Sequence, residues 1–142
     1  MFFQIDIFFL KKLSFFIIIE IASRKMFIYP MTGRRTTDNI LELIDEFKDY
    51  IGDIKGLASD DEFNTQPIIK YCEENDIILK TGVAKENHFS IGNPLGIVDA
   101  GVRNIKTLIR NYMMTRNSTK FLPHLDDLIE NYNDTIHSSL KN

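Results

Sequence analysis

The sequence predicts an α/β domain built on a five-stranded mixed sheet, with three antiparallel strands followed by two parallel ones, flanked by helices. Two observations lead to this prediction. Residues 1–31 are rich in Phe and Ile in short runs separated by polar residues, which is typical of consecutive buried strands. From residue 36 onwards, segments with apolar residues at helical spacing alternate with short strand-like runs.

The N-terminal part is expected to form three strands, Phe2–Leu10, Ser14–Ile21 and Lys25–Met31. The links between them are so short that neighbouring strands must be antiparallel. Within residues 1–29 the longest charge-free stretch is 13–19, whereas a membrane-spanning helix needs about 20 mainly apolar residues. A signal peptide would begin with basic residues, but the first charge is Asp6. Neither kind of segment is therefore expected.

The later elements follow from apolar spacing and from helix-breaking residues. We expect a helix capped by one of the residues 36–38 and ended by Gly52, a strand at 53–59, a helix at 63–75, a strand at 77–81, a loop at 82–93, a long helix at 94–116 and a last helix from about Leu125 to Ile136. Helices that connect successive strands place those strands parallel in one sheet.

Composition narrows the class of protein. The chain has 142 residues, of which 44% are hydrophobic and 26% charged, as expected for one globular domain over 1–142. The single Cys72 excludes an intrachain disulfide framework and a cysteine-rich zinc module in this chain. The net charge of −3 gives by itself no indication of a nucleic-acid partner.

Three acids occupy positions that the predicted topology would bring together. Asp6 lies midway along the first strand, Asp60 or Asp61 follows the fourth strand, and Asp99 lies in the first turns of the long helix. If the fourth strand pairs with the first, Asp6 and Asp60 become neighbours. Converging carboxylates repel one another unless a cation binds them, and their oxygens suit Mg²⁺ or Mn²⁺. The alternative is that they are unrelated surface acids.

Four motifs in this order resemble the catalytic core of retroviral-type integrases. They are Gln4–Ile7 with Phe16–Lys25 and Tyr29–Met31, then Ser59–Asp60 with Glu62–Phe63, then Gly96–Asp99 with Arg103 and Lys106, and finally Tyr132–Asn133 with His137–Leu140. Aspartate as the third acid makes the chain most similar to integrases of self-synthesising (Maverick/Polinton-type) DNA transposons and of large DNA viruses or virophages.

The resemblance implies a ribonuclease H-like fold and a polynucleotidyl transferase that cleaves DNA 3′ ends and performs strand transfer with Mg²⁺ or Mn²⁺. Asp6, Asp60 and Asp99 would be the catalytic, metal-binding residues, with Asp61 as the alternative to Asp60. The implied partners are element-end and target DNA and further copies of the chain, as a homodimer or higher oligomer, without a membrane. The expected location is the host nucleus, or a viral factory or virion.

Several features depart from this family's pattern. Asp99 is one methylene shorter than the usual Glu, the second motif is shortened and lacks its Gly, and Gly101 stands inside the long helix. The chain is expected to be a core that lacks the zinc-binding and C-terminal DNA-binding modules. Two other functions therefore stay open: an inactive remnant that binds nucleic acid or protein, and a ribonuclease H-like nuclease.

A basic strip accompanies the third acid. Arg103, Lys106 and Arg110 follow Asp99 at offsets that place all four on one helical face, where the cations are expected to contact DNA phosphates. An ordinary solvated face is the alternative. His88, in the expected loop before the long helix, is a further candidate DNA contact, although an ordinary loop histidine has the same appearance.

Overall fold

The computed structural model describes residues 1–31, 36–82 and 96–140, with side chains described up to Ile136. Its strands are β1 (Phe2–Leu10), β2 (Leu13–Glu20), β3 (Met26–Met31), β4 (Gly56–Ser59) and β5 (Ile78–Thr81). Its helices are α1 (Thr37–Ile51), α2 (Gln66–Glu74), α4 (Gly96–Arg116) and α5 (Leu125–Leu140), with single-turn 3-10 helices at Asp61–Phe63 and Leu122–His124. The expected order of elements is confirmed.

Element boundaries differ from the prediction by a few residues. The strand expected at 53–59 begins at Gly56, and the helix expected at 63–75 begins at Gln66 because a 3-10 turn precedes it. Helix α1 begins as expected, since the Thr36 side chain accepts a hydrogen bond from the Asn39 N–H at 3.2 Å. The loop expected at 82–93 lies outside the described residues apart from Gly82.

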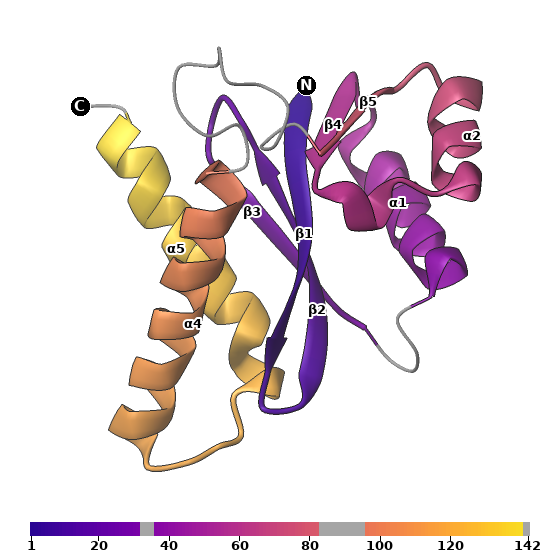
Figure 1. Ribbon diagram of the computed structural model, residues 1–142. Helices are drawn as coiled ribbons and strands as arrows, with labels where there is room; N and C mark the ends of the chain where they lie inside the picture. The colour runs from indigo at the N-terminus through magenta and orange to yellow at the C-terminus, as the bar shows by residue number, and fades with distance from the viewer. Residues whose placement is uncertain (32–35, 83–95, 141–142) are drawn as a thin grey trace.

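The five strands form one sheet in the order β3-β2-β1-β4-β5 (Figure 1). The pairs β1–β2 and β2–β3 are antiparallel, whereas β4 is parallel to both β1 and β5. This arrangement confirms the predicted fold class and puts β4 directly beside β1. Among the described residues, we find no helix that is both long and apolar enough to cross a membrane.

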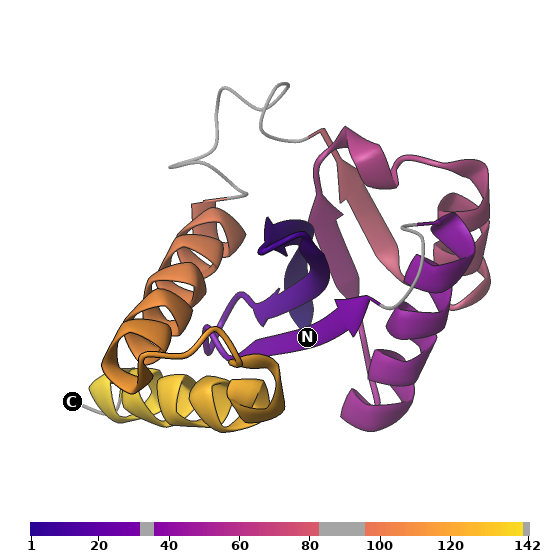
Figure 2. The same cartoon turned by 90° about the horizontal axis from the view of Figure 1, so that it is seen from below.

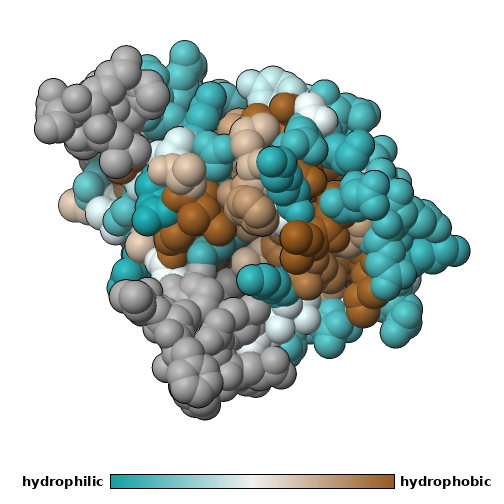
Figure 3. Space-filling model, turned by 90° about the horizontal axis from the view of Figure 1, so that it is seen from above, coloured by the Kyte–Doolittle hydropathy of each residue, from teal (hydrophilic) through white to brown (hydrophobic). Residues whose placement is uncertain are grey.

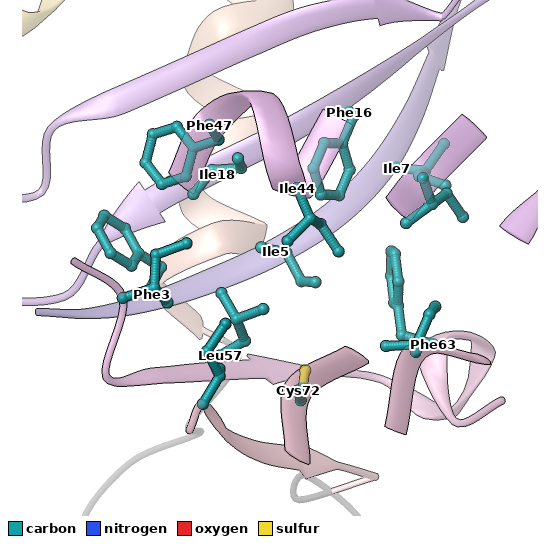
Figure 4. Close-up of a cluster of buried hydrophobic side chains, with 14 residues drawn as sticks. Phe3, Ile5, Ile7, Phe16, Ile18, Ile44, Phe47, Leu57, Phe63 and Cys72 are labelled. Atoms are coloured by element: carbon teal, nitrogen blue, oxygen red, sulfur yellow. The ribbon is translucent and has the colours of Figure 1, made fainter. Parts of the chain in front are cut away.

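Helices cover both faces of the sheet, α1 and α2 on one side and α4 and α5 on the other (Figure 2). Alternate residues of β1 therefore enter two different cores. Phe3, Ile5 and Ile7 pack with α1 and α2, in the cluster that Figure 4 shows. Phe8 and Leu10 pack on the α4 and α5 side. Cys72 belongs to the first core, where burial raises the pKa of its thiol to about 11 and keeps it neutral.

Phe2, Gly56 and Ile78 form a row across three neighbouring strands, at the edge of the sheet where β1, β4 and β5 begin. Phe2 pairs with Gly56, which pairs with Ile78, and the side chains of Phe2 and Ile78 are exposed. A Cβ on Gly56 would approach the Phe2 ring to 2.6 Å, so the ring needs a glycine beneath it. The end of the molecule that carries the N-terminus accordingly shows hydrophobic surface among hydrophilic surroundings (Figure 3).

Helix α4 approaches the sheet closely at Gly101. This glycine is buried, and a Cβ in its place would overlap with Cδ1 of Ile19 on β2 and lie 3.3 Å from Cε of Met26 on β3. The glycine costs helix stability, about 1 kcal/mol relative to Ala. Its position is explained by this close contact between helix and sheet.

We expect the change Gly101→Val to lower the free energy of unfolding by about 1–3 kcal/mol, because the added side chain overpacks the contact with Ile19. Urea unfolding followed by circular dichroism measures the change. Thr107→Val, at an exposed position of the same helix, is the matched control and should leave stability nearly unchanged. Equal effects of the two substitutions would contradict the close-contact explanation.

Candidate active site

The parallel pairing of β1 with β4 brings two of the expected acids together. Gln4 pairs with Ala58, so Asp6 lies beside the position that follows Ser59, which is Asp60. Carboxylate oxygens of Asp6, Asp60 and Glu62 all lie within 4.8 Å of one another. Elsewhere in the described part of the chain, no other three His, Cys, Asp or Glu side chains lie so close together. We call these three residues the acidic cluster.

The 3-10 turn after β4 adds Glu62 to this cluster. Asp60 caps the turn, and its Oδ1 accepts a hydrogen bond from the Glu62 N–H at 3.1 Å. Two contacts fix the position of the turn. Phe63 is fully buried in the core, and the buried Ser59 hydroxyl donates a hydrogen bond to the Asp60 carbonyl at 3.1 Å. Sequence reasoning did not identify Glu62 as a candidate ligand. The sequence did contain a signal for it: Asp60 can cap a turn, Glu62 follows two residues later, and the apolar Phe63 comes next.

Asp61 takes a different direction from Asp60. A Cβ on Gly82 would overlap with the Asp61 carboxylate, so this side chain lies over the Gly82 backbone at the end of β5. Gly82 also has a φ of +65°, a conformation that favours glycine. Of the two candidates for the second acid, Asp60 is the one that lies in the acidic cluster.

Asp99 lies near the acidic cluster without being part of it. Its side chain is exposed on the first turns of α4, and its negative charge still contributes to the electrostatics of Asp6. The start of α4 is fixed to β1 by Gln4, a buried side chain whose Oε1 accepts the Val98 N–H at 2.9 Å. One strand therefore carries Asp6 and, two residues earlier on the same face, the group that positions the helix of Asp99.

The surroundings of Asp6 make the ionised form of its carboxyl group unfavourable. Burial is the main reason that the pKa of Asp6 rises from 3.8 to about 6, and the negative charges of Asp60, Glu62 and Asp99 raise it further. A hydrogen bond from the Ile7 N–H to Asp6 Oδ1, at 2.8 Å, opposes part of this increase.

The donor set of the cluster fits a hard divalent cation. It consists of carboxylate oxygens alone, with no sulfur or imidazole, and its members are close enough to share an ion. A cation would also remove the repulsion that raises the pKa of Asp6. The cluster could thus hold Mg²⁺ or Mn²⁺ through Asp6, Asp60 and Glu62.

The basic strip runs along α4 beside β1. Arg103 and Arg110 are exposed, while Lys106 is half-buried with its Nζ 6.0 Å from the centre of the Phe8 ring. Val98 contacts Gln4, and Lys106 contacts Phe8. The eight helix residues and the four strand residues between these contacts span the same length, about 12–13 Å. The helix therefore follows β1, with Arg103 at about the level of Asp6 along the strand and with Lys106 and Arg110 further along. His88, the other expected DNA contact, lies outside the described residues.

The Tyr132–Asn133 motif fixes helix α5. The Asn133 side chain accepts the Met26 N–H at 2.8 Å and donates to the Met26 carbonyl at 2.9 Å, which attaches α5 to the edge strand β3. The Tyr132 hydroxyl accepts a hydrogen bond from Asn104 of α4 at 3.1 Å. These contacts give both residues a structural role.

Solved integrases share this architecture. The catalytic core domain of BIV integrase matches with a TM-score of 0.69 at 17% identity, over 90% of this chain and 80% of that one. The chain has the ribonuclease H-like fold of an integrase catalytic core. A chain of the simian T-cell lymphotropic virus intasome in complex with PP2A regulatory subunit B56 gamma matches with a TM-score of 0.70 at 16% identity, over 90% of this chain.

The sequence comparisons give no further assignment. No family model and no curated protein matches the chain. This chain spans 46% of the length of the intasome chain that it matches. At such low identity the likeness establishes the fold, and it leaves activity to be argued from the acidic cluster.

We expect Asp6→Asn to stabilise the metal-free protein at pH 7.5 by about 1–2 kcal/mol, less than the full pKa shift would give because water screens a half-buried carboxyl. The raised pKa means that the folded state binds more protons than the unfolded state between about pH 4 and 6. The stability contribution of protonated Asp6 is therefore present below pH 3.8 and lost as pH rises through 6. Urea unfolding at pH 4 and 7.5 measures it.

The difference between variant and wild type should be small at pH 4 and should reverse at pH 7.5 when Mg²⁺ is added, since a cation stabilises only the intact cluster. Asp53→Asn, an exposed acid before β4, is the control with the same change in charge. A wild-type protein that gains no more stability from Mg²⁺ than Asp6→Asn would contradict the cation site.

We expect Gln4→Leu to cost about 1–3 kcal/mol of stability, because it leaves the Val98 N–H without its acceptor in a buried place. Amide hydrogen exchange at the start of α4 should accelerate together with the loss of stability. Gln66→Leu, at an exposed helix start, provides the matched control. Unchanged protection at Val98 would show that Gln4 does not hold the helix.

Proposed function

We propose that this chain is the catalytic core of a metal-dependent DNA integrase, a polynucleotidyl transferase that cleaves DNA 3′ ends and joins them to target DNA. The observation that carries the proposal is the acidic cluster: Asp6 and Asp60 meet on adjacent parallel strands of an integrase-core fold, and Glu62 lies with them. The fold alone would not carry it, because one fold serves many functions.

The chain's own residues have distinct roles in this proposal. Asp6, Asp60 and Asp99 bind the metal ions, and the position of Glu62 makes it a further ligand. Divalent cations, when bound, supply a nucleophile-activating and charge-stabilising environment for phosphoryl transfer. Asp6 must be ionised to bind them, so binding weakens as pH falls below about 6. Arg103, Lys106 and Arg110 bind the phosphates of the DNA backbone.

The proposal extends to the related integrases, the substrates, the assembly and the location of the protein. The aspartate at position 99 supports a relationship to integrases of Maverick/Polinton-type transposons, large DNA viruses or virophages. DNA ends and target DNA are the proposed substrates, and a homodimer or higher oligomer is the proposed assembly. In this proposal residues 1–142 form the catalytic core as a single domain, and the protein acts in the host nucleus or in a viral factory or virion.

A strand-transfer assay with labelled duplex DNA and Mn²⁺ or Mg²⁺ tests the proposal. Cleavage and joining should fall by at least about a hundredfold in Asp6→Asn and Asp60→Asn, because each removes a carboxylate from the cluster. Asp61→Asn, next in sequence but directed towards Gly82, is the control and should stay active. Asp99→Asn should lose activity if the helix supplies the third ligand.

Other outcomes would identify other functions. Activity that does not depend on Asp6 would refute the proposal. Cleavage of an RNA–DNA hybrid or a branched junction in preference to duplex ends would indicate a ribonuclease H-like nuclease. Binding of DNA without any cleavage, in both metals, would indicate an inactive integrase fold that binds nucleic acid.

A further inference from the structure

A pocket of about 760 Å³ lies between the turn that joins β1 to β2 and the end of helix α4. In Figure 1 both segments lie at the end of the molecule opposite the start of α4. Leu10 and Met113 give the pocket apolar walls, and residues 117–120, which follow the helix, complete its lining. We call this hollow the hairpin pocket.

The charged side chains of the hairpin pocket are all basic. Lys11, Arg110 and Lys120 line it, whereas no Asp or Glu is among its described lining residues. All three cations are exposed, and within the described part of the chain none of them is in an ion pair. Ser118 and Thr119 add hydroxyl groups that can donate hydrogen bonds. Cationic side chains together with hydroxyl donors are the groups with which proteins bind phosphate.

The turn at the rim of the pocket has a sequence that its conformation disfavours. It contains two residues, because Leu10 pairs with Leu13, and both Lys11 and Lys12 have a positive φ, of 53° and 65°. Such a type I′ turn favours Asn-Gly, since residues with a larger side chain are strained in it. A bound anion would account for two lysines at positions where the fold by itself favours Asn and Gly.

The hairpin pocket continues the basic strip of α4. Arg110 belongs to both, and Arg103, at the other end of the strip, lies at about the level of Asp6 along β1. Lys11 follows Asp6 by five residues of extended chain, which span about 16–17 Å. Duplex DNA covers this length with about five base pairs at 3.4 Å each. The cations therefore form a row as long as about half a turn of duplex.

We propose that the hairpin pocket binds a phosphate of the DNA backbone about five base pairs from the acidic cluster. The inference rests on the proposed function, in which duplex DNA is the substrate. Lys11 and Lys120 bind this phosphate together with Arg110, and the rest of the basic strip binds the phosphates before it. The contact fixes the direction in which the duplex leaves the acidic cluster, along β1 towards the hairpin.

The length of the row is the reason to prefer duplex DNA as the occupant. A free phosphate would fill the pocket alone, whereas the cations continue along α4 to about the level of Asp6. A duplex carries phosphates at regular intervals over this distance, and it is stiff enough to contact both ends of the row at once.

Fluorescence anisotropy with the intact chain and a labelled duplex of about 20 base pairs tests the proposal. Divalent cations are left out because they compete for phosphates, so the measurement does not depend on cleavage. The Kd is measured over a series of NaCl concentrations, since each phosphate contact contributes about 0.9 to the slope of log Kd against log salt.

We expect Lys11→Gln combined with Lys120→Gln to raise Kd about tenfold and to lower the salt slope by about 2, because two phosphate contacts are lost. Lys55→Gln combined with Lys70→Gln removes two exposed lysines outside the pocket and is the control with the same change in charge. The control should leave Kd and slope nearly unchanged.

A second variant separates the ligand from the fold. Lys11→Asn combined with Lys12→Gly gives the turn the sequence that its conformation favours, so the urea midpoint of unfolding should rise. The same variant should weaken binding of the duplex about fivefold to tenfold, because it removes the cations of the turn. A more stable protein with an unchanged Kd would overturn the proposal.

The remaining outcomes distinguish this inference from the proposed function. Equal Kd values and slopes for the pocket variant and its control, while Arg103→Gln combined with Lys106→Gln weakens binding, would overturn the hairpin pocket and leave the proposed function standing. A wild-type chain that binds no duplex would overturn both. Displacement of the duplex by polyglutamate or by inorganic phosphate, at concentrations comparable with that of the DNA phosphates, would show that the pocket binds an acidic protein or a small anion instead.

Discussion

The parallel pairing of β4 with β1 is the constraint on which the candidate site depends. Side chains alternate along a strand, so a shift of one residue in this register would put Asp6 and Asp60 on different rows or faces. The register is fixed by the opposite face of the same strands, where Ile5 and Leu57 are buried against α1 and α2. A hydrophobic core on one side of the sheet thus holds together carboxylates that would separate if they were free to move.

That arrangement has an electrostatic cost, and the raised pKa of Asp6 expresses it. Burial and like charges both oppose ionisation of a group that must be ionised to bind a cation. This repulsion is also the reason that a bound cation would stabilise the fold, because the cation neutralises the carboxylates that repel one another. A site of this kind is therefore least stable in the state in which it is ready to bind.

Helix α4 supplies the second constraint. Gln4 holds its start beside Asp6, and Gly101 lets its next turn approach β2 closely. The helix then follows β1, so its basic strip begins at about the level of Asp6 and continues towards the far end of the strand. The small net charge of the chain thus conceals an acidic cluster and a basic strip that lie close together.

The sequence by itself determined the order of the elements and the two sheet directions, and it left the second acid open between Asp60 and Asp61. These depend on local spacing: buried runs of Phe and Ile, short links that force antiparallel pairing, and an acid directly after a strand. Tertiary structure decided which acids meet. Glu62 joined the cluster because a 3-10 turn anchored by Phe63 directs it there, and Asp61 left it because its side chain lies over Gly82.

The same distinction explains Gly101 and Asn133. In the sequence Gly101 is a weak point of a helix and Asn133 part of a motif with no evident partner. In the fold, one admits Ile19 and the other closes the edge of β3. Their partners lie far away along the chain, on elements that meet only when the sheet and its helices pack. Local pattern sets the elements, and long-range packing sets what their side chains do.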